Sequence, residues 1–183
     1  MEIIIALAVV GLLVLFFIAQ YNRLIRLNIG VDESFAQIEV QLKRRSDLIP
    51  NLVETVKGYA AHEQGTFDAV VTARAKATTA STVADVAAAD GMLTQALRGL
   101  LAVAEAYPDL KASSNFLSLQ EELSTTENKV AFSRQFYNDS VRLLNTAVKT
   151  IPTNFFAGFA KVDEREFYEV DEATNRNAPN VSF

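Results

Sequence analysis

The sequence has no cysteine, a single histidine, four prolines and seven glycines among its 183 residues. The absence of cysteine excludes disulfides, thiolate catalysis, cysteine-ligated zinc and a lipid-modified N-terminal cysteine. One histidine is too few for an imidazole-rich zinc site, or for a di-metal carboxylate bundle, which needs Glu-x-x-His on each of two helices. Low proline and glycine with abundant alanine, leucine, valine and glutamate favour an all-α protein over a β-sandwich.

Basic residues are outnumbered by acidic ones, with 17 Lys and Arg against 22 Asp and Glu. The net charge is −5, so the chain has no basic surface for a phosphate backbone and we expect no nucleic-acid partner. His62 is followed by Glu63, but the metalloprotease motif needs a second histidine where Thr66 stands. There is also no glycine-rich phosphate loop and no G-x-S-x-G motif. We therefore expect no catalytic residues, no cofactor and no bound metal.

The longest apolar run, residues 3–19, contains no polar or charged side chain. As a helix it would be about 26 Å long, and the residues that flank it can extend it to match a hydrocarbon core about 30 Å thick. Thirteen of its 17 residues are Ile, Leu, Val or Phe, so insertion is favoured by about 4–8 kcal/mol. A buried core helix normally has a polar face. We interpret residues 1–20 as a transmembrane anchor that contacts the lipid bilayer through residues 3–19.

A cleaved signal peptide is the main alternative for this segment. Signal peptides begin with a positive region and have small residues at −3 and −1. This chain has an acidic residue at position 2, and Phe17 would stand at −3 if Ala19 were at −1. We therefore expect the anchor to be retained. No basic residue precedes the run, while Arg23 and Arg26 follow it. The positive-inside rule then predicts a single-pass protein of the inner (plasma) membrane, with its N-terminus outside and its body in the cytoplasm.

Residues 21–30 have a mixed character and are expected to form a juxtamembrane connector. In residues 31–63 the apolar positions are spaced alternately by three and four, which is typical of a helix with one buried stripe. Arg45 is the polar exception on that stripe. Pro50 should kink or restart the helix, and Asp47 could cap the restarted segment.

Two further helices are predicted before residue 112. One extends to about residue 78 and is followed by an Ala/Thr/Ser-rich loop. The other begins near Thr82 or Ser81 as a cap, with Asp85 as a weak capping-box partner. Its apolar stripe contains Asp90 as an exception, and Pro108 should end it, since a residue before proline avoids the α region.

The fourth predicted helix has the longest apolar stripe. It begins near Ser113 or Ser114, ends before Pro152, and would be about 54 Å long. Such a length fits an elongated bundle, or a stripe that is shared with a partner. We favour the first interpretation.

An aromatic segment with Phe155, Phe156 and Phe159 follows, and then an acidic tail to residue 183. The aromatic side chains could close one end of the bundle, or they could contact the membrane surface or a partner. The acidic tail argues against binding to anionic lipid.

Polar residues are unexpectedly dense in three parts of the chain. They could cap helices and form ion pairs, each worth tenths of a kcal/mol when exposed. They could also form a partner-docking surface, because Arg and Tyr anchor protein interfaces. The candidates for docking are Arg44, Arg45, Asp47, Asn51, Lys57, Tyr59, His62, Glu63, Glu105, Tyr107, Asp109, Lys111, Asn115, Arg134, Tyr137 and Asn138.

Three stretches are similar to one known family. They are RRSDLIPNLVETVKGYAAHE at 44–63, EAYPDLKASSNF at 105–116 and ENKVAFSRQFYNDSVRLLNTAV at 127–148. The apolar run and the residues from Pro152 to Phe159 fit the same pattern. Over essentially its whole length the chain resembles the LemA family of bacterial membrane proteins.

The resemblance implies a single-pass protein with a cytoplasmic body and no known catalytic residues. The implied fold is all-α, with an N-terminal transmembrane helix followed by an elongated antiparallel four-helix bundle. We assign residues 1–20 to the anchor, 21–30 to the connector, 31–152 to the bundle, and 153–183 to the aromatic segment and acidic tail.

We therefore interpret the protein as a membrane-anchored helical adaptor or scaffold of the bacterial envelope, without catalysis. The expected partner is another inner-membrane protein, such as a membrane protease or an envelope-stress system. One alternative is a self-assembling structural membrane protein, in which the long stripe of the fourth helix makes a homo-oligomer. Another is an enzyme with an unrecognised carboxylate site.

Overall fold

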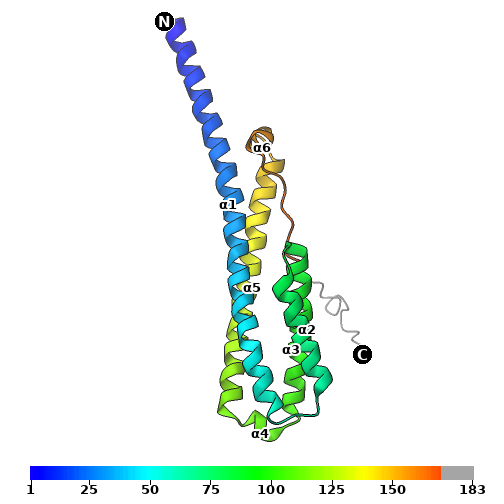
Figure 1. The fold of residues 1–183 in the computed structure, drawn as a ribbon. Coiled ribbons are helices and arrows are strands. Elements are labelled where there is room, and N and C mark those ends of the chain that lie inside the picture. The colour runs from blue at the N-terminus through cyan, green and yellow to red at the C-terminus, as the bar shows by residue number, and fades with distance from the viewer. Residues whose placement is uncertain (170–183) are drawn as a thin grey trace, which may run out of the picture. The chain divides into compact units, whose positions relative to one another are not determined.

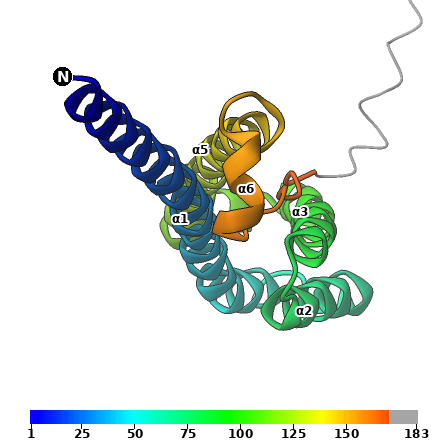
Figure 2. The ribbon, with the colours of Figure 1, turned by 90° about the horizontal axis from the view of Figure 1, so that it is seen from above.

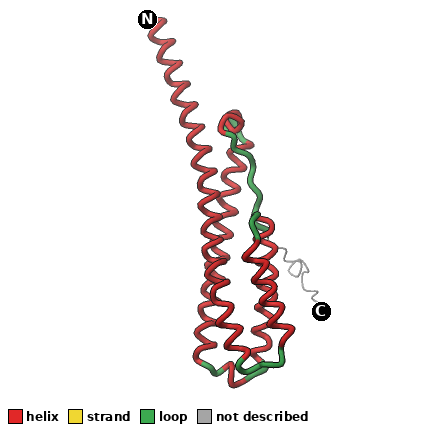
Figure 3. The backbone as a smooth tube through the Cα atoms, in the orientation of Figure 1, coloured by secondary structure: helices red, strands yellow, loops and turns green. Residues whose placement is uncertain are grey.

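The computed structural model describes residues 1–169, which form helices and no strands. The helices are α1 (Glu2–Lys57), α2 (Gln64–Thr79), α3 (Val83–Glu105), α4 (Pro108–Lys111), α5 (Ser114–Lys149) and α6 (Asn154–Ala160) (Figures 1 and 3). The all-α prediction is confirmed for this part of the chain. Residues 170–183, which hold the end of the expected acidic tail, lie outside the described residues.

The chain divides into two compact units. Unit 1 contains Met1–Ile38 and Phe132–Phe167, and unit 2 contains Glu39–Ala131 together with Tyr168. The helices α1 and α5 each supply residues to both units. Each unit has buried residues of its own.

The apolar run at residues 3–19 forms the first part of α1, and every residue of the run is exposed. By length and composition α1 could cross a membrane, and none of its most apolar 18-residue window is buried. The core helix of a soluble protein would bury such residues against its neighbours. The exposure therefore favours a membrane span.

α1 continues through the expected connector and through Pro50. Residues 21–30 are helical, and Leu24 is fully buried there. The helix also continues through Pro50, so the predicted restart at this residue is wrong. Asp47 caps no new helix, because it lies within α1 and pairs with Lys43 at 3.2 Å.

A side chain from α2 explains how α1 tolerates Pro50. Proline has no N–H, so the carbonyl four residues earlier, that of Ser46, receives no hydrogen bond from within the helix. Nε of Arg74 donates to this carbonyl oxygen at 3.0 Å. The guanidinium therefore replaces the missing donor, and α1 continues where its local sequence would end it.

We expect Arg74→Met to destabilise unit 2 by about 1–3 kcal/mol, because the carbonyl of the buried residue Ser46 then loses its donor. In a Pro50→Ala background the cost should shrink by about 1 kcal/mol, since the new backbone N–H can donate to that carbonyl. A double-mutant cycle of urea unfolding measures this coupling. If the two substitutions are additive, Arg74 does not compensate for the proline.

Five helices build the core of unit 2. α2 and α3 lie side by side (Figures 1 and 2). The spacing by three and four residues marks the face that each long helix buries. The core residues are Ile49, Leu52, Val53 and Val56 from α1, Ala60 from the α1–α2 connection, Phe67, Val70 and Ala73 from α2, Leu93, Leu97, Leu100 and Ala104 from α3, Leu110 from α4, and Phe116 and Leu123 from α5.

Two predicted boundaries of α3 are confirmed. The hydroxyl of Thr82 accepts a hydrogen bond from the backbone N–H of Asp85 at 3.1 Å, which caps the start of the helix. At the other end, Tyr107 is extended, with φ −116° and ψ 95°. This conformation follows from the ring of Pro108, which excludes the preceding residue from the α region. Pro108 itself lies in the first turn of α4, where no N–H is needed.

In unit 1, the first part of α1 packs against the second part of α5. Most of the buried apolar side chains lie on the predicted stripes, but Leu24 lies in the expected connector and Ala147 lies off the stripe of the fourth helix. The rings of Phe35 and Tyr137 lie 5.6 Å apart. The buried apolar residues of these two helices are Leu24, Val31 and Ile38 from α1 and Tyr137, Val141, Leu144 and Ala147 from α5.

The aromatic segment forms the short helix α6, which lies beside α1 (Figure 1). Ala157 packs with Leu24 and Ala147 in a small buried cluster. The ring of Phe156 lies edge-to-face on the ring of Phe17, with centroids 5.1 Å apart. The segment therefore contacts the end of the apolar run of α1.

Candidate functional site

The α1–α2 connection and the α3–α4–α5 connection lie at the same end of unit 2 (Figures 1 and 3). The side-chain amide of Asn115 donates to the hydroxyl of Thr55 at 3.4 Å, which links α5 to α1. Nine of the sixteen predicted docking residues lie on these connections or on the adjoining helix ends, and we call them the end surface. They are Lys57, Tyr59, His62, Glu63, Glu105, Tyr107, Asp109, Lys111 and Asn115.

Most of the end surface is accessible. Seven of its nine side chains are exposed, while Glu63 and Tyr107 are half-buried. Tyr107 packs against the core of unit 2, so its position is held by the fold. Nζ of Lys57 lies 5.4 Å from the centroid of the Phe67 ring, a cation–π contact that orients the lysine. Tyrosine is a residue type that is enriched at protein interfaces.

The remaining predicted residues do not join the end surface. Arg44, Asp47 and Asn51 are exposed on the part of α1 that belongs to unit 2. Arg134 and Asn138 are half-buried on the part of α5 that belongs to unit 1.

Arg45, a predicted docking residue, is fully buried in unit 2. Its Nη1 atom donates to Oδ1 of Asp90 at 2.8 Å. Its Nη2 atom donates to the hydroxyl of Thr94 at 2.8 Å and lies 3.1 Å from a carboxylate oxygen of Glu127. A guanidinium with no exposed surface cannot contact a partner, so the docking role is corrected to a structural one.

Asp90 and Tyr168 complete this buried network, and sequence reasoning assigned neither to a site. Asp90 is 1% exposed, and its Oδ2 atom accepts a hydrogen bond from the hydroxyl of Tyr168 at 2.7 Å. Arg45 and Asp90 each interrupt an apolar stripe, on different helices and with opposite charge. Since a buried charge must be paired, this coincidence was a usable signal. No sequence pattern indicates the contact with Tyr168.

Tyr137 was the second predicted docking residue that proves to be buried. Its hydroxyl donates to the backbone carbonyl of Glu166 at 2.8 Å. The side chain of Asn145 exchanges two hydrogen bonds with the backbone of Arg165, each 2.9 Å long. We call residues 162–167, the segment held by these bonds, the strap. Tyr137 therefore fastens the strap to α5 and is not available on the surface.

Burial raises the pKa of the Tyr137 hydroxyl above its ordinary value of 10.0, with the carboxylates of Glu166 and Asp32 adding to the rise and Arg165 opposing it. A group whose pKa is higher in the folded state stabilises the fold below its unfolded pKa, and this stabilisation is lost as the pH rises through the folded pKa. We expect wild type to be more stable than Tyr137→Phe at pH 8, by about 1 kcal/mol for the lost hydrogen bond.

At pH 11 this stability difference should narrow, because the unfolded wild-type chain can ionise Tyr137 and the variant has no hydroxyl to ionise. Chemical unfolding of both proteins at the two pH values measures the difference, and every other tyrosine is common to both. An equal difference at both pH values would contradict the assigned pKa shift.

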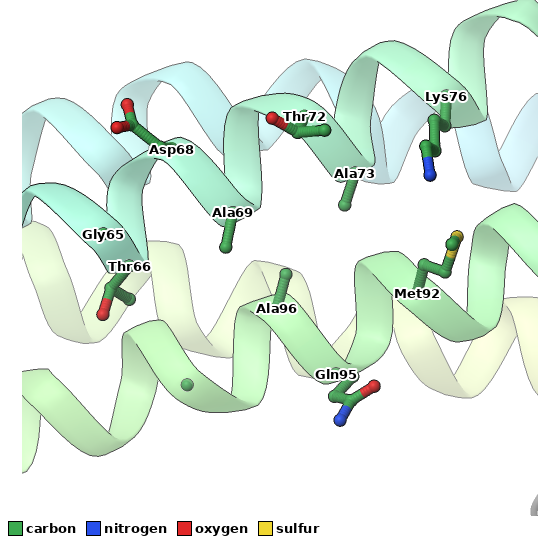
Figure 4. A pocket seen from close by; sticks show the side chains of 11 residues that line it. Gly65, Thr66, Asp68, Ala69, Thr72, Ala73, Lys76, Met92, Gln95 and Ala96 are labelled. Carbon is green, nitrogen blue, oxygen red and sulfur yellow. The ribbon is translucent and has the colours of Figure 1, made fainter.

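Two of the grooves in unit 2 are lined by residues of α2 and α3. One, of about 680 Å³, lies between α2 and α3, with Ala69, Ala73 and Ala96 pointing into it (Figure 4). The second, of about 560 Å³, is lined by residues of α1, α2 and α3 that include Arg74 and Asp90. Four charged side chains that line the second groove make contacts described above: Arg74, Asp90, and the ion pair of Lys43 with Asp47.

Residues 1–169 contain aspartate and glutamate side chains and one histidine that could in principle bind a metal ion. Within that range no three histidine, aspartate or glutamate side chains are gathered closely enough to hold an ion.

Comparison with known proteins supports the resemblance found in the sequence. The model of the LemA family matches residues 34–183. Protein LemA of Metamycoplasma hominis is 24% identical over 177 residues, which cover 92% of this chain and 81% of that protein. Magnetosome protein MamQ 2 of Paramagnetospirillum magneticum is 24% identical over 176 residues, or 82% of this chain, and magnetosome protein MamQ of Magnetospirillum gryphiswaldense is 22% identical over 173 residues, or 79%.

This chain spans 65% and 64% of the lengths of those two magnetosome proteins. The family match, in contrast, covers most of this chain. It includes the end surface, the buried Arg45 network and the strap. The chain belongs to the LemA family.

Proposed function

We propose that this protein is a membrane-tethered helical adaptor, which holds a protein partner at the bilayer and catalyses no reaction. The observation that carries the proposal is the exposure of residues 3–19, an apolar run that is long enough to span a bilayer and in which no residue is buried within the fold. Tethering confines the body to the membrane plane and raises its effective concentration for membrane partners.

We infer that the body, residues 31–152, is an elongated antiparallel four-helix bundle. Support comes from the core of unit 2, to which α1, α2, α3 and α5 all contribute. In such a bundle the end surface would lie at one end, where the α1–α2 connection and the α3–α4–α5 connection join the helices. The exposed residues Arg23 and Arg26 follow the run. They support a body in the cytoplasm, an N-terminus outside, and insertion in the inner membrane.

The proposed partner is a second inner-membrane protein that docks on the end surface; a membrane protease or an envelope-stress system is a suitable class. Two tyrosines among exposed charges fit the composition of a docking site. A partner in the same membrane also gives the tether a clear effect, because two proteins confined to one membrane meet far more often than two proteins in solution.

Site-specific photo-crosslinking in the membranes of living cells tests the adaptor. We expect the full chain to give the same protein adduct with probes at Tyr59, Asp109 and Asn115. Probes at Ala75 and Ala84, which are also exposed in unit 2, should give none. If the adduct forms equally from all five positions, or from none, the end surface is not a docking site.

Charge reversal makes the test sharper. Lys57→Glu with Lys111→Glu should reduce the adduct strongly, since both lysines belong to the end surface. Lys76→Glu with Lys129→Glu makes the same change in net charge at exposed positions of unit 2 outside that surface. This control pair should leave the adduct unchanged.

One observation favours a self-assembling scaffold as the second candidate. Phe132, Phe136 and Leu143 are 72%, 54% and 58% exposed, and their spacing by four and seven residues places them on one face of α5. Pairing of this face between copies would bury it. The mass of the full chain in nanodiscs, compared with that of Phe132→Ser with Phe136→Ser, separates the two. A monomer in both cases leaves only the adaptor.

A further inference from the structure

The outer face of α6 is apolar and exposed. Phe155 and Phe159 are 66% and 74% exposed, and Ile151, four residues before Phe155, is 75% exposed. Helical side chains four residues apart lie on the same face, so the two phenylalanines point the same way. A face of this kind on a water-soluble surface would need to be covered.

Aromatic contacts fix the position of α6 along α1. The ring of Phe156 lies 5.1 Å from that of Phe17 and 6.1 Å from that of Phe16, and the ring of Phe159 lies 6.0 Å from that of Phe17. Phe17 is two residues from the end of the apolar run, which is about 3 Å along a helix axis. α6 is therefore level with the last turn of the proposed membrane span.

The charges around α6 agree with this position. No charged residue occurs between Lys149 and Lys161. Lys161 is exposed and has a left-handed backbone with φ 51°, so the chain turns sharply as it leaves α6. A lysine at such a border can extend its ammonium toward lipid phosphates while the apolar residues stay below it.

The acidic residues that follow lead away from the span. Glu164 pairs with Lys149 at 2.7 Å. The Arg165 guanidinium contacts Asn28 at 3.1 Å and Asp32 at 2.7 Å. Asn28 is eleven residues after Phe17, or about 16 Å along α1. The guanidinium of Arg165 in the strap thus lies well beyond the level of Phe17.

We propose that α6 lies in the boundary between headgroups and hydrocarbon of the bilayer that holds the apolar run, with Phe155 and Phe159 inserted among the acyl chains. This inference rests on the membrane tether proposed above. We assign lipid as the cover of the exposed face of α6 because this face adjoins the exposed apolar run, where the ring of Phe159 lies 6.0 Å from the ring of Phe17. Aromatic side chains favour this depth. Because α6 would be a second contact with the bilayer, in addition to the apolar run, it would fix the rotation of unit 1 about the α1 axis.

The absence of tryptophan from the chain allows a direct test with single-tryptophan variants. The full chain is reconstituted in phosphatidylcholine vesicles whose acyl chains are brominated either near the carbonyl or near the terminal methyl. Phe155→Trp and Phe159→Trp report on α6, and Val10→Trp reports on the middle of the run. Phe132→Trp is the matched control, because Phe132 is 72% exposed in the same unit.

We expect the emission of Phe155→Trp and Phe159→Trp to shift to the blue and to lose intensity mainly with the shallow bromines. Val10→Trp should lose intensity mainly with the deep bromines, and Phe132→Trp with neither. If Val10→Trp is quenched while both α6 probes behave like Phe132→Trp, the inference is overturned and the tether stands.

Two other outcomes also contradict the proposal. A blue shift of the α6 probes without quenching, which grows with the ratio of protein to lipid, would show that a second copy covers the face. Absence of quenching at Val10→Trp would overturn the tether and the α6 inference together.

Discussion

Arg45→Met should destabilise unit 2 by about 3–5 kcal/mol, because it removes one partner of a buried ion pair and leaves the other charge inside the fold. Arg45 has no exposed surface, and Asp90, 2.8 Å away, is 1% exposed. Without the guanidinium, the carboxylate of Asp90 keeps the cost of burial and loses the charge that compensates it. Urea unfolding of the full chain in detergent measures the change.

The neighbouring residue supplies the matched control. Arg44 is exposed, so Arg44→Met removes the same charge and should change the stability by no more than about 0.5 kcal/mol. Asp90→Asn should restore part of the stability lost in Arg45→Met, because it neutralises the stranded charge and keeps an acceptor for the hydroxyl of Tyr168. If Arg45→Met is as mild as Arg44→Met, the buried pair does not hold unit 2 together.

Val10→Arg with Leu12→Arg should release the chain from membranes. Each substitution replaces an apolar residue near the centre of the run and changes the insertion free energy by about 3–4 kcal/mol. Together they offset the about 4–8 kcal/mol that favours insertion of the run. Flotation of the full chain with membranes, after a carbonate wash, measures the fraction that stays bound.

A control variant with the same change in net charge separates the loss of membrane insertion from a general effect of two added positive charges. Tyr21→Arg with Asn22→Arg adds two positive charges just after the run, where Arg23 and Arg26 already stand. This variant should float like wild type. If Val10→Arg with Leu12→Arg also floats like wild type, the apolar run is not the anchor.

Local rules predicted much of the fold because they act within a few residues. Spacing by three and four marked the buried faces of the helices, the Thr82 hydroxyl capped α3, and Pro108 excluded its neighbour from the α region. The failure at Pro50 is tertiary in origin. Its cause is a donor on Arg74, which only the packing of α2 on α1 brings to the Ser46 carbonyl.

In the candidate site, too, local sequence rules failed where contacts between distant residues decide the structure. Arg45 and Tyr137 belong to residue types that anchor interfaces, and sequence alone assigned both to the docking surface. Their burial depends on partners far along the chain, Asp90 for the first and the Glu166 carbonyl for the second. Which of the sixteen residues share one surface likewise depends on where two connections meet, and a linear pattern carries no such information.

The most direct test of a tethered adaptor is the yield of the end-surface adduct in cells, compared between the wild-type run and Val10→Arg with Leu12→Arg at equal expression. We expect a probe at Asp109 to give one protein adduct with the wild-type run. The yield should fall sharply when the run no longer inserts, because the effective concentration near a membrane partner is lost. An adduct of the same partner at unchanged yield from the released chain would contradict the tether's role, and no adduct from either chain would contradict the adaptor.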